Sequence, residues 1–379
     1  MGGVFSAFRS ELSRLKPKFA GFDQGPSAGP TGDETTTEID PLGWTIPIPR
    51  SIGRDRGGKQ CLRMKLLPSI ICLLFLTLHC YAAPPLQTTT PADFYQFQLG
   101  DFQVTALLDG VNPRNPAEIA TDPEKVSKHL ERHRIDKTVM ASYNVFLIDT
   151  GSKLLLVDAG TGDMLGENGG YLVDSLRAAG HQPEQIDAVL LTHFHPDHIN
   201  GLVSDGELVF PNADVLCDER ESEYWLDENQ EAKAPQAARE RFNQIQSILA
   251  PVIEADRLKP FSSSSDLFPG VSASTAPGHS PGHTAYLVES GGQSLLFWGD
   301  TVHIEQAQFA NPELTVKFDW DQGAAAKRRL YFLILADRHG WLIASPHISF
   351  PGLGKVVEEQ GDYRWIPVPY GTNYENEES

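Results

Sequence analysis

One short segment constrains this chain more than any other. It runs from Thr192 to His198 and carries three histidines and one aspartate, directly after the apolar run 188–191. Buried imidazole and carboxylate groups cost free energy unless something pairs with them. Together they suit borderline divalent cations, zinc above all. The pattern therefore predicts a metal site at the end of a buried strand.

Further candidate ligands stand at the carboxyl ends of other apolar runs, where loops supported by a rigid sheet usually carry chemistry. In chain order they are His279, His283, Asp300 and His347. A single histidine or aspartate at a strand end is more often structural than functional. Their agreement along one chain instead favours a site that holds more than one ion.

Several segments outside these motifs resemble the secreted methyl parathion hydrolase branch of the metallo-β-lactamase-fold hydrolases, which is related to the zinc lactonases that open acyl-homoserine lactones. The segments are 99–107, 144–160, 178–185 and 347–352. The resemblance covers roughly residues 92–370. It implies an α+β fold, a four-layer αββα sandwich with two metals bound by loops at the sheet ends. The motifs are specific for this fold and for two metals, and much less so for substrate.

The resemblance also implies a ligand assignment. His193, His195 and His279 would hold one ion, Asp197, His198 and His347 the other, and Asp300 would bridge the two. We expect two divalent cations, with zinc as the first choice. Two such ions can share a hydroxide and lower its pKa towards neutrality. Asp197 and Asp300 are therefore expected to be catalytic, together with His303.

His303 departs from the resemblance, because the matching position in the parathion hydrolases looks apolar. It stands three residues after Asp300 and is expected at the mouth of the site, as a polar wall or as a proton donor to the leaving group. Asp158 resembles the family's structural aspartate and is expected to orient ligands. His283 is expected to cap its loop or to act in the site.

Aromatic side chains lie beside the ligand motifs. Trp225 matches a pocket tryptophan of the parathion hydrolase branch, with an ordinary helix core residue as the equal alternative. Leu165 falls where those enzymes carry an aromatic residue, which puts an aromatic clamp on the leaving group in doubt. Phe194, Trp298 and Phe350 suggest an apolar mouth, although each could also face the core.

Charge narrows the class of partner. The chain has 31 basic and 50 acidic side chains. So acidic a surface repels nucleic-acid phosphates and anionic membranes. We therefore expect a small, neutral ester or lactone as the substrate, no nucleic-acid partner and no stable insertion into a membrane. A homodimer is possible.

The amino-terminal part has a different character. Residues 1–63 are rich in Gly, Pro, Ser, Thr and Arg without a sustained period, which indicates an unstructured leader or a mis-assigned start. Residues 64–82 have a basic start at Met64-Lys65, an apolar run and small residues at the exit, the plan of a secretory signal peptide. Residues 83–379 would then form one hydrolase domain, secreted or periplasmic, with Cys217 as its one cysteine.

Periodicity predicts a mixed set of elements. The expected strands are 101–108, 143–149, 153–158, 187–192, 208–217, 271–276, 284–289, 293–299 and 341–345. The expected helices are 122–133, 170–179, 218–227, 233–250 and 321–338. Strands come first as neighbours and later alternate with helices, which is consistent with two packed sheets covered by helices on both sides.

These observations lead to one function and two alternatives. The first is a dinuclear-metal hydrolase in which a metal-bridging hydroxide cleaves uncharged ester-like bonds: a lactone, an aryl ester or a phosphotriester. The alternatives on the same fold are a mononuclear iron persulfide dioxygenase and a glyoxalase-type thioesterase. An iron oxygenase typically needs two histidines and one carboxylate, whereas this chain presents seven candidate ligands.

Overall fold

The computed structural model describes residues 93–262 and 265–369 of the 379-residue chain. The chain divides into Met1–Ala83 and Pro84–Ser379, and all described residues belong to the second part. The predicted leader (1–63) and signal peptide (64–82) lie outside the described residues. Among the residues that are described, no helix has both the length and the apolar character needed to cross a membrane.

The first half of the described chain forms a seven-stranded sheet. Its strands, in spatial order, are β1 (Phe94–Leu99), β2 (Phe102–Arg114), β3 (Val139–Asp149), β4 (Leu154–Val157), β5 (Ala188–Leu190), β8 (Asp214–Asp218) and β9 (Leu258–Phe261). Neighbours from β1 to β4 are antiparallel, and those from β4 to β9 are parallel. The strands β4, β5 and β8 therefore all end at the same edge of the sheet.

The second half forms another seven-stranded sheet. Its order is β10 (Asp266–Phe268), β11 (Val271–Thr275), β12 (Thr284–Ser290), β13 (Gln293–Phe297), β14 (Leu342–Ala344), β15 (Leu353–Glu359) and β16 (Asp362–Pro367). Only β13 and β14 pair in parallel, so their carboxyl ends also meet at one edge. The strands β6 (Val203–Ser204) and β7 (Glu207–Leu208) make a separate small hairpin.

Alternation along the strands builds two cores. Ala188 and Leu190 of β5 join apolar side chains from both sheets, whereas Val189 faces the opposite side and joins the cluster under the helices. Successive side chains of a strand point to opposite faces, so one short strand serves both cores. The cluster shared by the two sheets lies between them.

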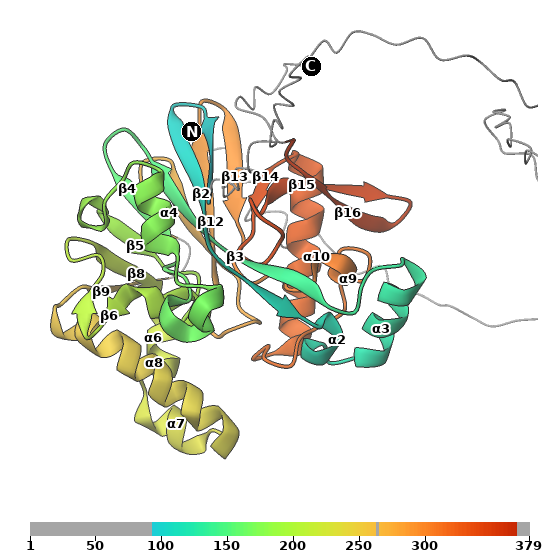
Figure 1. Cartoon of the computed structure of the whole chain (residues 1–379), viewed down its shortest axis with the longest axis horizontal. Helices are drawn as coiled ribbons and strands as arrows, with labels where there is room; N and C mark the ends of the chain where they lie inside the picture. The colour runs from blue at the N-terminus through green and yellow to red at the C-terminus, as the bar shows by residue number, and fades with distance from the viewer. Residues whose placement is uncertain (1–92, 263–264, 370–379) are drawn as a thin grey trace, which may run out of the picture. The chain divides into compact units, whose positions relative to one another are not determined.

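Helices cover the outer faces of the two sheets, as Figure 1 shows. On the first sheet lie α4 (Leu172–Ala178) and α8 (Gln236–Glu254). The helix α8 buries a stripe at helical spacing, formed by Phe242, Ile245, Leu249 and Val252. The helix α10 (Gln322–His339) packs against β15 of the second sheet. The expected α+β fold with two packed sheets between helices is confirmed.

Acidic residues begin two helices where the sequence predicts them. Asp122 accepts a hydrogen bond from the Lys125 backbone N–H at 2.9 Å and caps α3 (Pro123–Arg132). Asp218 does the same for α6 (Glu219–Trp225), accepting from Arg220 N–H at 3.0 Å. Such caps satisfy N–H groups that have no partner within the helix.

One predicted strand is wrong. The segment 208–217 is interrupted, because β7 ends at Leu208 and β8 begins at Asp214. Pro211 has no N–H to donate to a ladder, and Pro211-Asn212 favours a turn. The remaining predicted strands and helices correspond to observed elements. The chain also contains elements that were not expected, including β1, β9, β15, β16 and the short helices α2 (Pro116–Ile119), α5 (Pro196–Ile199), α7 (Glu228–Lys233) and α9 (Glu305–Gln308).

Candidate metal centre

Strand ends from both sheets converge on one buried polar cluster. The segment 193–198 leaves β5, and the single turn α5 begins with Pro196 and carries Asp197 and His198. Proline suits a first helical position, where its missing N–H is not needed. Asp300 and His347 follow the parallel strands β13 and β14. The seven predicted ligands, scattered over 155 residues of sequence, are thus brought together.

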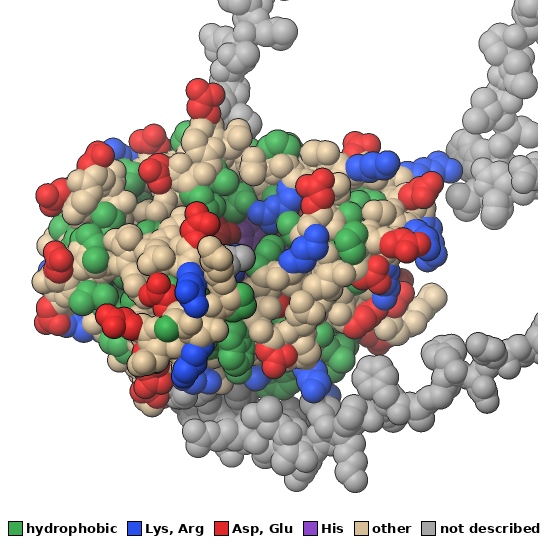
Figure 2. Space-filling view, turned by 90° about the horizontal axis from the view of Figure 1, so that it is seen from below, with side chains coloured by type: hydrophobic (Ala, Val, Ile, Leu, Met, Phe, Trp, Pro, Cys, Tyr) green, Lys and Arg blue, Asp and Glu red, His purple; other side chains and the backbone are tan. Residues whose placement is uncertain are grey.

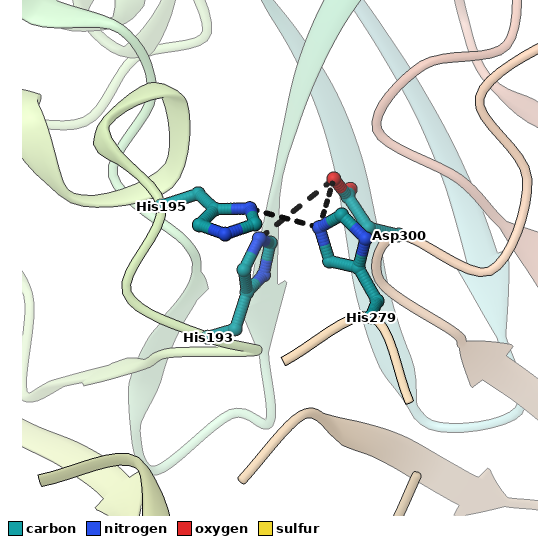
Figure 3. Close-up of side chains that lie close together, drawn as sticks. All are labelled: His193, His195, His279 and Asp300. Atoms are coloured by element: carbon teal, nitrogen blue, oxygen red, sulfur yellow. Dashed lines mark hydrogen bonds and ion pairs between the residues drawn. The ribbon is translucent and has the colours of Figure 1, made fainter. Parts of the chain in front are cut away.

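Four of these side chains form the first group, which Figure 3 shows. They are His193, His195, His279 and Asp300. The Nε2 atom of His279 lies 2.8 Å from His195 Nδ1 and 3.2 Å from Asp300 Oδ2. The Nε2 atom of His193 lies 3.7 Å from the same Asp300 oxygen. All four residues are buried.

The second group shares Asp300 but uses its other oxygen. It consists of Asp197, His198, His347 and Asp300. Asp300 Oδ1 lies 3.1 Å from His198 Nε2 and 3.2 Å from His347 Nε2. Asp197 Oδ2 lies 3.4 Å from His347 Nε2. The two groups therefore meet on opposite oxygens of one carboxylate.

The chemistry of these donors fits a pair of cations. The Nε2 atoms of His193 and His198 and the Oδ1 atom of Asp300 are buried and make no hydrogen bond of acceptable geometry, although His198 Nε2 and Asp300 Oδ1 lie 3.1 Å apart. Native structures rarely leave buried polar atoms in this state unless an ion or water pairs with them. Imidazole and carboxylate are ordinary ligands of divalent transition metals.

Protonation suits ligation in part of the candidate centre. Burial alone would raise the pKa of Asp300, but the surrounding histidines, His198 first, hold that pKa well below its usual range. Burial lowers the pKa of His193 and of His195 well below the ordinary value, and their histidine neighbours lower it further. These directions favour an ionised Asp300 and neutral His193 and His195, the forms that bind a metal. Burial also lowers the pKa of His198, His279 and His347, but the neighbouring carboxylates outweigh burial and raise the pKa of all three. A cation bound there would therefore replace a proton.

Carboxylates orient one histidine in each group. Asp158 Oδ2 lies 2.9 Å from His198 Nδ1, and its other oxygen accepts from Thr192 N–H at 2.7 Å. This contact agrees with the orienting role expected for Asp158. Asp319 Oδ1 lies 2.8 Å from His279 Nδ1. A carboxylate on the far nitrogen fixes the ring's tautomer and direction.

Glu221 accepts hydrogen bonds from two loops that carry predicted ligands. This fully buried residue of α6 accepts hydrogen bonds from Phe194 N–H at 3.0 Å and from Gly282 N–H at 2.7 Å. It also accepts from Trp225 Nε1 at 2.8 Å and from the Ser280 hydroxyl. One carboxylate therefore fixes both the loop that carries His193 and His195 and the loop that carries His279.

Sequence reasoning missed three of these supports: Asp319, Glu221 and Arg329. The buried guanidinium of Arg329 donates to the carbonyl oxygens of Thr301, Pro312 and Leu314 at 2.7 Å or less. It thereby fixes the segment that carries His303 and Asp319. A polar residue inside an otherwise apolar helix face is the one signal that could have identified Arg329, and nothing local distinguishes Asp319.

The two remaining histidines have different environments. His283 Nδ1 lies 3.0 Å from the Ala276 carbonyl oxygen, and its Nε2 accepts from Asp300 N–H at 3.0 Å. Both ring nitrogens are thus used in tying the loop to Asp300, a structural role. His303 Nε2 lies 2.9 Å from Asp300 Oδ2, while its Nδ1 is buried without a partner.

The three aromatic residues suggested for an apolar mouth face the core instead. Phe194 and Trp298 are completely buried, and Phe350 packs against the core between the sheets. Trp225 is also buried, in the cluster under α8, although its ring stands edge-on to His195 with centroids 6.0 Å apart. Leu165 lies in the 3-10 segment η1 (Gly162–Asn168) and is partly exposed.

The surface is hollowed beside the second group. One cavity is lined by His303 and His347, together with Arg114, Met140 and Glu305. An adjoining cavity is lined by Tyr143 and by Asp197, His198 and His347. Figure 2 shows histidine in the depth of a hollow, with acidic, basic and hydrophobic side chains around its rim. The candidate centre therefore lies beside a hollow of the surface on this side.

Two solved structures are similar to this chain over nearly their whole length. The crystal structure of the hydrolase AbOPH, of the beta lactamase superfamily, is 36% identical, with a TM-score of 0.71, over 75% of this chain and 100% of that chain. The structure of AidC, a dizinc quorum-quenching lactonase in complex with a product, is 28% identical, with a TM-score of 0.68, over 73% of this chain and 98% of that one.

A curated relative matches locally. Exodeoxyribonuclease WalJ of Streptococcus pneumoniae is 40% identical over 62 residues, which are 16% of this chain and 21% of that protein. The chain thus matches about a fifth of the length of this relative. The sequence profile of the Metallo-beta-lactamase superfamily matches residues 141–347, which include all seven predicted ligands. The chain belongs to the metallo-beta-lactamase superfamily.

Proposed function

We propose that this protein is a dinuclear-metal hydrolase of uncharged ester-like bonds. One observation carries the proposal: the two oxygens of Asp300 face two separate sets of ligand atoms, 3.2 Å from His279 on one side and 3.1 Å from His198 on the other. A carboxylate in this position suits two ions better than one. The group of His193, His195 and His279 would hold the first, and the group of Asp197, His198 and His347 the second.

Divalent cations in these positions would supply Lewis acidity and lower the pKa of a shared water towards 7. The chain's own residues hold the histidines and carboxylates in place and keep the ligand atoms buried away from bulk water. No side-chain nucleophile is required. Zinc is the metal we propose, because AidC is described as a dizinc enzyme and the ligands are imidazole and carboxylate.

His303 is proposed to position Asp300. A burial-lowered pKa of about 4 keeps its ring neutral. In a neutral ring, the nitrogen that faces the Asp300 carboxylate carries the proton, so Nδ1 is left as an acceptor. This arrangement favours positioning over donation of a proton to the leaving group.

The proposed substrates are lactones, aryl esters and phosphotriesters. AidC, a lactonase that is similar along nearly its whole length, supports the first of these. Phosphodiesters and nucleic acids are disfavoured, because a net charge of −19 opposes a polyanion. The arrangement of seven candidate ligands in two groups also disfavours the mononuclear iron dioxygenase, because that enzyme needs one metal only. The thioesterase stays as the alternative hydrolase.

A substrate panel tests the proposal. The zinc-loaded protein is assayed with an acyl-homoserine lactone, an aryl ester, methyl parathion, a glutathione thioester and single-stranded DNA. Turnover of a lactone, aryl ester or phosphotriester supports the proposal. Turnover of DNA or the thioester alone, or oxygen consumption with a thiol persulfide, would count against it.

A further inference from the structure

Arg114 and Tyr143 form a fixed pair at the edge of the candidate centre. Arg114 ends β2 opposite Val139 of β3, and Tyr143 lies four residues further along β3, on the same face of the sheet. The Arg114 Nη2 atom donates to the Tyr143 hydroxyl, and the guanidinium carbon lies 5.6 Å from the centre of the Tyr143 ring. A hydrogen bond and a cation–π contact therefore hold this guanidinium.

The pair stands directly against a predicted metal ligand. The Tyr143 ring meets His347 edge-on, with centroids 5.2 Å apart and an interplanar angle of 87°. Tyr143 lines the cavity of Asp197 and His198, while Arg114 lines the adjoining cavity of His303, and both cavities include His347. A ligand that occupies the two cavities would touch the candidate centre at one end and Arg114 at the other.

Arg114 has unused donors. In the part of the chain that the structure describes, it makes no ion pair with a carboxylate, and its one hydrogen bond goes to Tyr143. A guanidinium carries five N–H donors in a planar fork that matches a carboxylate. Glu305 lines the same cavity, but one of its oxygens accepts from the Ser349 backbone N–H at 3.0 Å and hydroxyl at 2.8 Å.

The rest of the cavity wall is mixed, with apolar side chains beside the polar His303, Glu305 and Gln306. Ile119, Val139 and Met140 line it, and Met140 is 55% exposed. One cation beside these apolar side chains suits a short hydrocarbon chain that ends in an acid.

We propose that Arg114, held by Tyr143, binds a carboxylate that the substrate carries at a distance from its scissile bond. The inference rests on the proposed ester hydrolysis and narrows its substrate class to esters with an acidic tail, such as the monoesters of dicarboxylic acids. The reacting centre itself remains uncharged. A single carboxylate differs from a polyanion, because one guanidinium can neutralise it locally despite the acidic surface.

Two esters with acyl chains of equal length test the inference. They are para-nitrophenyl hydrogen glutarate, which ends in a carboxylate, and para-nitrophenyl pentanoate, which ends in a methyl group. Replacing Arg114 by Met should lower kcat/KM for the glutarate ester about tenfold or more, the usual worth of a charge-assisted hydrogen bond. For the pentanoate ester we expect a change within about twofold, because that ester makes no charged contact. Arg114→Lys should fall between Arg114→Met and the unchanged protein.

Arg132→Met is the matched control. Arg132 lies exposed in α3 and lines neither cavity, yet its loss changes the net charge by the same amount. The two variants are compared by the ratio of kcat/KM for the glutarate ester to kcat/KM for the pentanoate ester. If Arg114→Met and Arg132→Met change this ratio equally, the cause is the long-range electrostatic field of the protein, and the proposed subsite is overturned. A parallel loss of both activities in Arg114→Met would also overturn it.

A binding measurement separates the subsite from the proposed function. Glutaric acid monoanilide, in which an amide replaces the ester, is titrated calorimetrically into each protein. If neither ester is hydrolysed, the proposed function fails, but binding that weakens tenfold in Arg114→Met still supports the subsite. Equal binding to the unchanged protein and to Arg114→Met would overturn it whatever the activities.

Discussion

Asp319 holds His279 from behind: its Oδ1 atom lies 2.8 Å from His279 Nδ1, while His279 Nε2 faces Asp300 at 3.2 Å. Burial alone would lower the pKa of His279, but its contacts with Asp300 and Asp319 raise that pKa to about 9. In a metal-bound state the cation would take the place of the proton on Nε2, and Asp319 would keep the proton on Nδ1. Asp319 thus sets which nitrogen of His279 is free to bind.

Replacing Asp319 by Asn should weaken metal binding at the group of His193, His195 and His279. Loss of such an outer carboxylate typically costs 10- to 100-fold in metal affinity, roughly the effect we expect here. Competition with a chromophoric chelator measures it. Asp321→Asn is the control, because Asp321 caps α10 through Ala324 N–H at 2.9 Å and contacts no ligand. Unchanged affinity in Asp319→Asn would contradict the orienting role.

Replacing Glu221 by Ala should destabilise the metal-free protein strongly. The change leaves the N–H groups of Phe194 and Gly282 and the Trp225 indole without their acceptor. Each buried group left unsatisfied costs about 1–3 kcal/mol, so we expect a total of about 3 kcal/mol or more in urea unfolding. Glu221→Gln keeps one acceptor oxygen and should cost less.

Glu223→Ala serves as the control for Glu221. Glu223 is exposed two residues further along α6, where a substitution should change the unfolding free energy by no more than about 0.5 kcal/mol. A similar loss of unfolding free energy in both variants would show that the measurement reports the stability of the helix α6 and not the hydrogen bonds of Glu221.

Metal load is the most direct check of the centre. Elemental analysis of the purified protein should find close to two divalent ions per chain, and His193→Ala should abolish turnover without unfolding the protein. His181→Ala is a suitable control, because His181 is not among the clustered donors. One iron per chain and no second metal would rule out the dinuclear assignment.

Chelation should lower thermal stability. A ligand that binds the folded state alone stabilises it by about 4 kcal/mol when its concentration is a thousand times its dissociation constant. Treatment with a chelator should therefore lower Tm, and added zinc should restore it. Differential scanning calorimetry at fixed pH follows both steps. If neither the chelator nor added zinc changes Tm, the buried donors bind no metal.

Export is a separate prediction for the segment 64–82. A protein expressed from Met64 should leave the cytoplasm and acquire a new amino terminus near Ala83, because its basic start and apolar run have the plan of a signal peptide. Amino-terminal sequencing of the native protein decides the matter. Intact residues 1–82 on the mature chain would contradict both the signal peptide and the internal start at Met64.

Local patterns predicted the donors but not their surroundings. The segment 193–198 identifies itself, because its ligands are neighbours in sequence. By contrast, Arg114 lines a cavity together with His347 only because β2 and β3 pair across a long connection. Asp319 and Glu221 likewise act through tertiary contacts, so nothing in their own segments marks them out.

The errors have the same origin. Phe194 and Trp298 lie beside ligands in sequence, yet their side chains are fully buried. The strands β15 and β16 escaped prediction because they carry many charged side chains, and because β16 and the last three residues of β15 are largely exposed. Apolar periodicity detects strands that face a core, and it is weak where a strand runs along the surface.

Each ligand group draws on both sheets. His193, His195, Asp197 and His198 belong to the half that ends with β9, whereas His279, Asp300 and His347 belong to the half that begins with β10. A break between β9 and β10 would leave each fragment with a whole seven-stranded sheet and neither with a whole ligand group. The two halves are therefore complementary fragments. The described region has one cysteine, Cys217, which is unpaired, so no disulfide joins the halves there. A cation bound between them would instead act as a reversible cross-link.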